Sequence, residues 1–340
     1  MPRPVRLVTG VPGWLGTRFV QVLVNGFGGE GPVQPSRTIR CLVMDHADVK
    51  PLNDVSSEIE VVKGDLRSPE SLAAAVEGVE TIFHLAGVVH AKRLADFYAI
   101  NTQGTRNLLA AAAAASVRRV IYVSSNSVAG YRRQGALMRE SDPPRPYLAY
   151  GKSKHLAECA IREAAQQHKL ETLILRPCWY YGPGQPERQT RFFRMIKRGR
   201  PIVFGNGDNL RSLSYLDNVI EALLLAAQAP QASGQVYWIA DARPYRTIGI
   251  YRTVAELLNV KRFRPIHLPG PASEMCMAAD WCLQRLGCYQ QELHVGGEMN
   301  KDIACSIELA TRELGYRPRV ELREGMRRSI DWCRSAGIAL

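Results

Sequence analysis

Short apolar runs alternate with longer segments of helical periodicity through the first half of the chain. Each apolar run is bounded by glycine, proline or polar residues, which is typical of a buried strand. These runs predict strands over Val5–Thr9, Thr38–Met44, Ile59–Val62, Thr81–His84, Arg119–Ser124 and Thr172–Leu175. The segments between them predict helices over Leu15–Val24, Pro69–Val76, Ala95–Ala115 and Tyr147–His168. Repeated units of this kind predict a parallel sheet that is covered by helices on both faces.

The pattern loosens after Pro177, where glycine, proline and arginine become frequent. Shorter helices are predicted over Arg191–Arg198, Val219–Ala227, Ile248–Leu258, Ala272–Leu286, Ile307–Leu314 and Arg323–Ala336. The stretch from Gly26 to Ser36 is rich in glycine and proline and predicts a loop before the second strand. Because 340 residues exceed the usual size of a single core, we expect a large domain and a smaller lobe.

Composition narrows the class of protein. The chain is 46% hydrophobic and 22% charged, as in an ordinary globular enzyme, and no apolar run approaches the ~20 residues that span a bilayer. The N-terminus lacks a signal-peptide pattern and the eight cysteines form no C-x-x-C pair, so we expect a cytoplasmic protein with reduced thiols and no metal site. The net charge of +12 is dispersed and accompanies no nucleic-acid-binding motif, so nucleic acid is not an expected partner.

A glycine-rich turn follows the first predicted strand. It contains Gly10, Gly13 and Gly16, and an apolar-periodic helix begins directly after it. Glycines permit a tight turn and the close approach of backbone to a pyrophosphate, and the helix N-terminus offers free amides to the anion. The turn therefore predicts a dinucleotide-binding site, to which the neighbouring Trp14 and Leu15 also contribute.

Tyr150 and Lys154 lie four residues apart in the predicted helix Tyr147–His168. Residues at this spacing share one face of a helix, so the phenol and the ammonium are expected to be neighbours. A cation beside a phenol favours the ionised form and lowers its pKa from about 10. The pair therefore predicts a tyrosine that can give or take a proton near neutral pH.

The order Thr9-Gly10-x-x-Gly13-x-x-Gly16 followed by Tyr150-x-x-x-Lys154 resembles the short-chain dehydrogenase/reductase family. The length points to its extended branch, of the NAD-dependent epimerase/dehydratase type, with features of 3β-hydroxysteroid dehydrogenases. The resemblance runs from about Val5 to Trp332.

The resemblance implies an α/β fold: a Rossmann-type, doubly wound parallel sheet with a smaller C-terminal lobe. Residues 1–177 would form the NAD(P)-binding domain, and 178–340 would form mainly the substrate lobe, with some segments returning to the sheet. Dimerisation through the helices Ala95–Ala115 and Tyr147–His168 is usual in such proteins, so a homodimer is expected.

The catalytic residues are carried over from the same resemblance. The segment Tyr122–Gly130 matches the family motif whose serine holds the substrate oxygen, which identifies Ser125, with Ser124 and Ser127 as competitors. Asn126 beside it would contact substrate, and Asn101 matches the N-x-x-G-T motif in which asparagine supports the active site.

Further positions match cofactor-binding segments of the family. These predicted contacts are Asp65, Leu66, Leu85, Ala86, Gly87, Ser124, Tyr150, Lys154 and Pro177. Asp45 follows the second strand and could bind the ribose hydroxyls, and no arginine occupies that strand end. NAD is therefore the predicted cofactor, and NADP is less favoured.

Two residues bear on the substrate. Arg211 matches an arginine that pairs with the diphosphate of nucleotide sugars, although an ion pair with Asp217 would explain it equally well. Trp179 stands where many nucleotide-sugar enzymes have asparagine, and it could pack on a sugar or another apolar ring. The basic stretch Arg188–Arg200 could help to hold a phosphorylated substrate.

The sequence thus supports three functions. The first is an NAD-dependent 4-epimerase or 4-keto reductase of a nucleotide sugar, in which Ser125, Tyr150 and Lys154 assist hydride transfer. The second is an oxidoreductase of hydrophobic alcohols similar to 3β-hydroxysteroid dehydrogenases, favoured by Trp179 and the apolar stretch Met275–Leu286. The third is a non-catalytic NAD-binding regulator, against which the intact catalytic residues argue.

Overall fold

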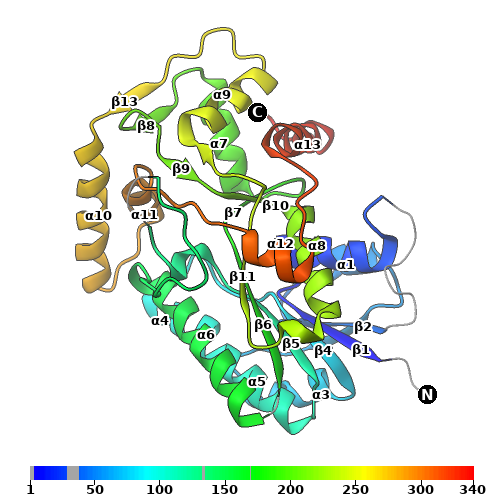
Figure 1. Cartoon of the computed structure of the whole chain (residues 1–340). Helices are drawn as coiled ribbons and strands as arrows, with labels where there is room; N and C mark the ends of the chain where they lie inside the picture. Colours follow the sequence, from blue (N-terminus) through cyan, green and yellow to red (C-terminus); the bar gives the residue numbers. More distant parts are fainter. Residues whose placement is uncertain (1–3, 29–37, 132–134, 169) are drawn as a thin grey trace.

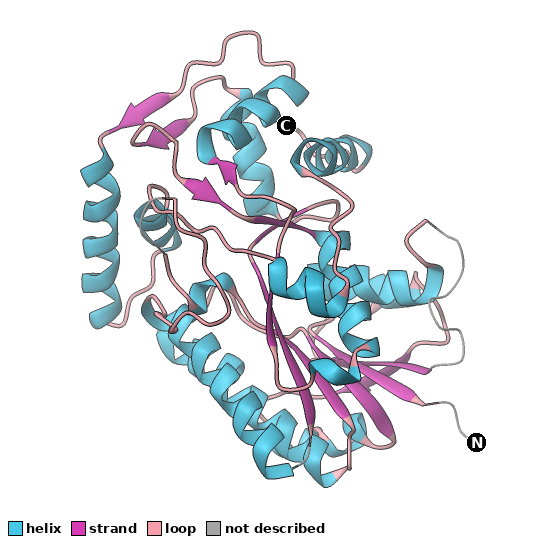
Figure 2. Cartoon of the chain, viewed as in Figure 1, coloured by secondary structure: helices cyan, strands magenta, loops and turns pink. Residues whose placement is uncertain are grey.

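A seven-stranded parallel sheet forms the centre of the molecule (Figures 1 and 2), in a computed structural model that describes residues 4–28, 38–131, 135–168 and 170–340. The strands follow the order β11-β6-β5-β4-β1-β2-β3. They are β1 (Val5–Thr9), β2 (Thr38–Val43), β3 (Glu60–Lys63), β4 (Val79–His84), β5 (Arg119–Val123), β6 (Glu171–Pro177) and β11 (Val236–Ile239). The order reverses between β1 and β4, and ligands of doubly wound sheets bind beyond the strand ends at such a point.

Helices cover both faces of this sheet. One face packs against α1 (Trp14–Asn25), α2 (Lys50–Asn53), α8 (Leu216–Gln228) and α12 (Glu308–Leu314). The other packs against α3 (Ala73–Val76), α5 (Gly104–Ala114) and α6 (Leu148–His168). Side chains alternate along a strand, so neighbours in sequence enter different cores. Val8 and Phe83 lie in the first core, whereas Leu7 and Ile82 lie in the second.

The second half of the chain builds a separate lobe and also completes the sheet. The lobe core is formed by α7 (Glu187–Lys197), α9 (Thr247–Leu257) and α13 (Leu322–Ser335) with the paired short strands. Those strands are β7 (Trp179–Tyr181) with β10 (Leu213–Tyr215), β8 (Ile202–Phe204) with β13 (Ile266–Leu268), and β9 (Leu210–Arg211) with β12 (Tyr245–Arg246). Helices α10 (Gly270–Arg285) and α11 (Gln291–Glu298) pack on each other at one edge (Figure 1). From this half, β11 pairs with β6, and α8 and α12 cover the sheet.

The Rossmann-type fold class and the first six strands are confirmed, with strand ends within two residues of the prediction. The helix predicted over Ala95–Ala115 is instead divided. It consists of α4 (Leu94–Phe97), a π-helical segment η2 (Tyr98–Gln103) and α5. The elements without a clear periodicity in the sequence were not predicted: α2, α11, the sheet strand β11 and the short strands of the lobe. The loop predicted from Gly26 to Ser36 lies mostly outside the described residues.

Across the described ranges, no helix combines the length and the apolar character that a membrane crossing would need. Three 3₁₀ segments, η1 (Pro69–Ser71), η3 (Asn126–Val128) and η4 (Pro230–Ala232), complete the architecture.

Candidate active site

The glycine turn lies between β1 and α1 and packs against the end of β4. Gly10 has a φ of +83°, and a Cβ there would lie 2.7 Å from the backbone nitrogen of Ala86. A Cβ on Gly13 would lie 2.7 Å from the carbonyl oxygen of Gly10. Side chains are therefore excluded from the turn, which brings the start of α1 close to the segment after β4.

Trp14, the first residue of α1, joins this turn to the lobe. Its indole Nε1 donates a hydrogen bond to the carbonyl oxygen of Pro183, at 2.7 Å. Its ring also packs edge-on near Tyr180, with centroids 6.3 Å apart. The side chain of Trp14 is thus held by Pro183 and Tyr180. Its backbone N–H, at the start of α1, is the group expected to face a cofactor.

A lysine that was not predicted, Lys63 of β3, lies beside the end of β2. Asp45 is exposed, as expected for a ribose contact, and the Lys63 ammonium from β3 donates to the carbonyl oxygen of Asp45 at 3.3 Å. The Asp65 carboxylate accepts hydrogen bonds from the Arg67 guanidinium, which lower the carboxyl pKa. Leu66 beside it is buried in the second core.

Asn101 connects the segment after β4 to α6 through η2. Its Oδ1 accepts from the backbone N–H of Val88 at 2.8 Å, and its Nδ2 donates to the carbonyl oxygen of Val88 and to Ser153 Oγ, both at 3.0 Å. A Cβ on Gly87 would lie 3.3 Å from Asn101 Oδ1 and 3.6 Å from Lys154 Nζ. The π-helical turn therefore holds a fully engaged asparagine beside the Lys154 amine.

The three candidate serines differ in their hydrogen-bond partners. Ser124 Oγ donates to the buried carboxylate of Glu158 at 2.6 Å, so it is committed to the interior. Ser125 Oγ lies 2.8 Å from Ser127 Oγ and caps η3 by accepting from the Ser127 backbone N–H at 3.2 Å. Ser125 also interacts with the Tyr150 hydroxyl, and that interaction favours the ionised phenol.

The expectation that Lys154 lowers the pKa of Tyr150 is wrong. Burial raises the pKa of Tyr150, and the groups that oppose this rise are the Ser125 hydroxyl and the Arg188 cation. Lys154 instead donates to the carbonyl oxygen of Val123 at 2.8 Å and lies over the ring of Tyr122, 4.3 Å from its centroid. Burial lowers the pKa of Lys154 to about 7, so its positive charge is itself costly at this position.

Arg211 is not paired with Asp217, so that structural explanation is also wrong. Asp217 accepts two hydrogen bonds from Arg18, at 2.8 and 3.0 Å. Arg211 Nη2 donates to the carbonyl oxygen of Glu298 at 2.6 Å, while its buried Nε has no partner among the described residues. A buried N–H without an acceptor is rare in folded proteins and points to a ligand or water.

Trp179 and its neighbour lie on different sides of β7. Trp179 packs edge-on against Phe192, with centroids 5.5 Å apart, and lines a shallow groove with Met326. Tyr180, which the sequence analysis did not single out, is close enough to Tyr150 for their charges to interact. Because side chains alternate along a strand, Tyr180 points towards Tyr150 while Trp179 points towards Phe192.

The two remaining predicted contacts lie at the ends of other elements. Asn126 begins η3, and Pro177 ends β6 beside Ile239 of β11.

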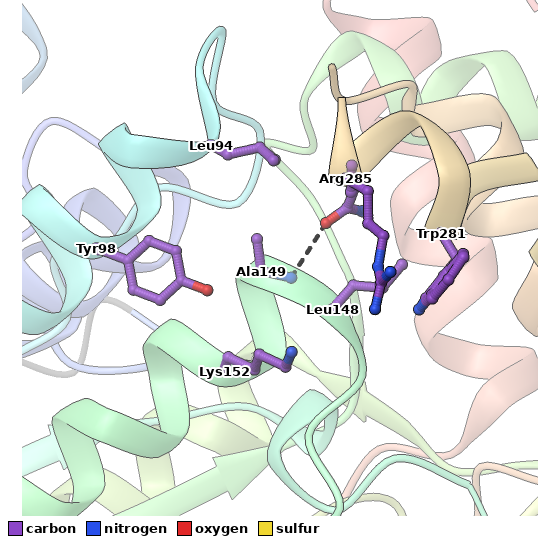
Figure 3. A pocket seen from close by; sticks show the side chains of 8 residues that line it. Leu94, Tyr98, Leu148, Ala149, Lys152, Trp281 and Arg285 are labelled. Carbon is purple, nitrogen blue, oxygen red and sulfur yellow. Dashed lines mark hydrogen bonds between the residues drawn. The ribbon is translucent and has the colours of Figure 1, made fainter. Parts of the chain in front are cut away.

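A cavity of about 210 Å³ lies behind the start of α6 (Figure 3). Its walls come from four elements: Leu94 of α4, Tyr98 of η2, Leu148 and Lys152 of α6, and Trp281 and Arg285 of α10. The Gln284 side chain closes it by accepting from the backbone N–H of Ala149 at 3.1 Å. None of the predicted catalytic residues lines this cavity, so it is distinct from the site around Tyr150.

Residues 7–270 match the model of the 3-beta hydroxysteroid dehydrogenase/isomerase family. The chain belongs to this family. It is 42% identical to an uncharacterized protein, y4nL, of Sinorhizobium fredii, over 97% of this chain and 95% of that protein. It is 30% identical to a 3 beta-hydroxysteroid dehydrogenase/Delta 5-->4-isomerase of Mycobacterium tuberculosis, over 77% of this chain and 75% of that enzyme.

Other similar proteins handle nucleotide sugars. The chain is 26% identical to the UDP-glucose 4-epimerase of Vibrio cholerae, over 97% of this chain and 95% of that enzyme. Among solved structures, MoeE5 in complex with UDP-glucuronic acid and NAD is 26% identical and superposes with a TM-score of 0.73, covering 97% of this chain and 99% of that chain. The family and these relatives are enzymes, so the chain is an enzyme of the extended short-chain dehydrogenase/reductase type.

Proposed function

We propose that the protein is an NAD-dependent enzyme that acts on a nucleotide sugar, as a 4-epimerase or a 4-keto reductase. The observation that carries this proposal is the buried Nε of Arg211, which lacks a protein acceptor on the lobe side of the site. A diphosphate would satisfy that N–H and the positive charge together. The similarity to the Vibrio cholerae epimerase and to MoeE5 supports the same substrate class.

The residues around the glycine turn fit a dinucleotide. The turn of Gly10, Gly13 and Gly16 at the switch point of the sheet would hold the pyrophosphate, and Asp45 would hold the ribose of the adenosine half. Lys154 uses one of its three N–H donors on Val123, so two remain for the nicotinamide ribose. When bound there, NAD supplies the hydride acceptor and donor of the reaction.

Two side chains would contact the substrate oxygen, and two others would position the site. The Ser125 hydroxyl orients that oxygen, and the Tyr150 hydroxyl gives or takes its proton. Asn101 is a positioning residue, because it reaches the site only through Val88 and the helix that carries Tyr150. Lys154 donates to the carbonyl oxygen of Val123 at the end of β5. Its ammonium would therefore bind the cofactor and would not act on the phenol of Tyr150.

The test compares single variants on UDP-glucose and NAD. Tyr150→Phe and Ser125→Ala should lower kcat for inversion, or for NAD-dependent oxidation, at C4 by about 10²–10⁴-fold, since each removes a proton-transfer or orienting group. Lys152→Met is the control, because Lys152 is an exposed residue of the same helix. UDP, GDP and dTDP should be screened alongside, and one of them should raise the melting temperature of the NAD-loaded protein. Full activity of Tyr150→Phe would refute the proposed chemistry.

A second candidate is a dehydrogenase of hydrophobic alcohols. The match to the 3-beta hydroxysteroid dehydrogenase/isomerase family favours it, as does the apolar outer side of α10, where Met275 is 72% and Leu286 is 78% exposed. Such an enzyme would reduce NAD with a 3β-hydroxysteroid and would gain no thermal stability from nucleotides. These two results together would replace the first proposal.

The homodimer and the cytoplasmic location remain proposals. The helices α5 and α6 lie together on one side of the sheet, and Leu156 of α6 is 38% exposed there. A second copy that packed along these two helices would bury the Leu156 side chain. The molar mass in solution, measured by light scattering, should be twice that of the chain.

A further inference from the structure

Arg188 is a half-buried cation beside the candidate active site. It lies in the first turn of α7, and its guanidinium Nη1 contacts Nε2 of His90, in the loop after β4. The neighbouring arginine Arg194 pairs with Glu187, but within the described part of the chain no carboxylate pairs with Arg188. Among the described residues, the recorded partner of the Arg188 guanidinium is therefore an imidazole, which must accept the N–H.

A chain of ring contacts places this guanidinium near the reactive phenol. His90 stacks on Tyr289, with centroids 6.5 Å apart, and Tyr289 meets the edge of Phe97 at 5.5 Å. Phe97 in turn packs against Tyr150 at 5.8 Å. Arg188, from the lobe, and Tyr150, from the sheet domain, are thus connected through these three rings, and their charges act on each other.

The charge of Arg188 is not neutralised by its neighbours. Burial, followed by the charges of Arg188 and His294, lowers the pKa of His90 to about 4, so His90 is neutral at physiological pH. Burial also lowers the pKa of Arg188, and the phenols of Tyr150 and Tyr289 act against that shift. A partly desolvated cation costs free energy unless an anion pairs with it.

We propose that Arg188 binds a carboxylate that the substrate carries on its reacting ring, so that acidic nucleotide sugars are the preferred substrates. The planar guanidinium fork matches a carboxylate in a bidentate arrangement. The diphosphate is assigned to Arg211, which has its own buried N–H without an acceptor, so Arg188 is available for a second anionic group. This inference rests on the proposed nucleotide-sugar chemistry and specifies its substrate.

The experiment uses two ligands that differ only in the group expected at Arg188. UDP-glucuronic acid carries a carboxylate where UDP-glucose carries a hydroxymethyl group. Their affinities for the full-length, NAD-loaded protein are measured by calorimetry. We expect the acid to bind on the order of 10- to 100-fold more tightly, the range typical of a charged hydrogen-bonded pair. Arg188→Gln should abolish the preference, and Arg188→Lys should keep part of it.

Arg191→Gln is the matched control, because Arg191 is an exposed arginine one turn further along α7. Equal affinity for the two ligands, or a preference that survives in Arg188→Gln, would overturn the inference and leave the proposed function standing. Binding of neither ligand would instead refute the nucleotide-sugar function, and this inference with it.

A pH profile separates a role at the site from a purely structural one. The Arg188 charge lowers the pKa of Tyr150, whereas burial and the Glu298 charge raise it. Removing the cation should therefore shift the pH of half-maximal activity to higher values in Arg188→Gln and not in Arg191→Gln. An unmoved midpoint in Arg188→Gln would contradict the placement of this charge beside the phenol.

Discussion

Replacement of Glu158 by alanine should destabilise the fold far more than its position on a helix suggests. The Glu158 side chain is completely buried, and its two oxygens accept hydrogen bonds from the Arg176 guanidinium at 2.8 and 2.6 Å. Burial alone would raise the pKa of this carboxyl, but the bonds from Arg176 and Ser124 bring the pKa below its ordinary value. The alanine variant would leave the Arg176 guanidinium, itself 2% exposed, without its hydrogen-bonded counter-charge.

The expected loss is about 3–5 kcal/mol, the usual cost of breaking a buried ion pair from one side. Arg162, which is also bonded to Glu158 at 3.3 Å, is partly exposed and can turn to water, so it adds little. Glu158→Gln keeps the volume and one acceptor oxygen, and its loss should be smaller than that of the alanine variant.

Equilibrium unfolding in guanidinium chloride measures this effect. The indole of Trp238 is buried and lies beneath the Arg176 guanidinium at 5.6 Å, so its fluorescence reports on this region. Glu308→Ala is the control, because the Glu308–Arg139 pair is largely exposed and should contribute about 0–1 kcal/mol. A Glu158→Ala protein that unfolds within about 1 kcal/mol of the parent would refute the claim that Arg176 is isolated from water.

Two further changes test other parts of the structure. Burial lowers the pKa of His84 from 6.5 to about 3, so the folded state favours the neutral ring. The stability that His84 contributes is fully present above pH 6.5 and is lost progressively as the pH falls from 6.5 towards 3. In His84→Asn, the free energy of unfolding measured in urea should depend less steeply on pH between 7 and 5, by up to about 1.4 kcal/mol per pH unit. An unchanged slope would count against a buried neutral ring. Asp45→Ala should shift the ratio of kcat/KM for NAD over NADP towards NADP by about tenfold, and Lys63→Ala should shift it the other way, since the lysine is the nearby cation for a 2′-phosphate. Unaltered ratios in both variants would remove Asp45 from the cofactor site.

The parts of the site that were predicted from sequence depend on local patterns. The glycine turn and the Tyr150–Lys154 spacing are readable because strand, turn and helix follow one another along the chain. The first six strands are readable because each is a short buried run between turn residues.

The parts that were missed depend on partners far away in sequence. Asp217 pairs with Arg18 rather than with the nearby Arg211, and Arg188 meets His90 across the gap between lobe and sheet. The predicted effect of Lys154 on the pKa of Tyr150 was also wrong. Helical spacing shows which residues share a face, but it does not show that the Lys154 amine donates to the carbonyl oxygen of Val123. Such choices are settled by tertiary packing, which leaves no periodic signal in the chain.

The late strand β11 and the helices α8 and α12 have a consequence for synthesis of the protein. They cover the sheet face that carries Val8, Phe83 and Ile121, and the same core extends to Tyr316. While the ribosome is still adding residues before Tyr316, that face of the nascent sheet is covered only in part, by α1 and α2 and later by α8. The core on this face of the sheet is therefore completed only when nearly the whole chain has been made, and until then its exposed apolar side chains favour aggregation.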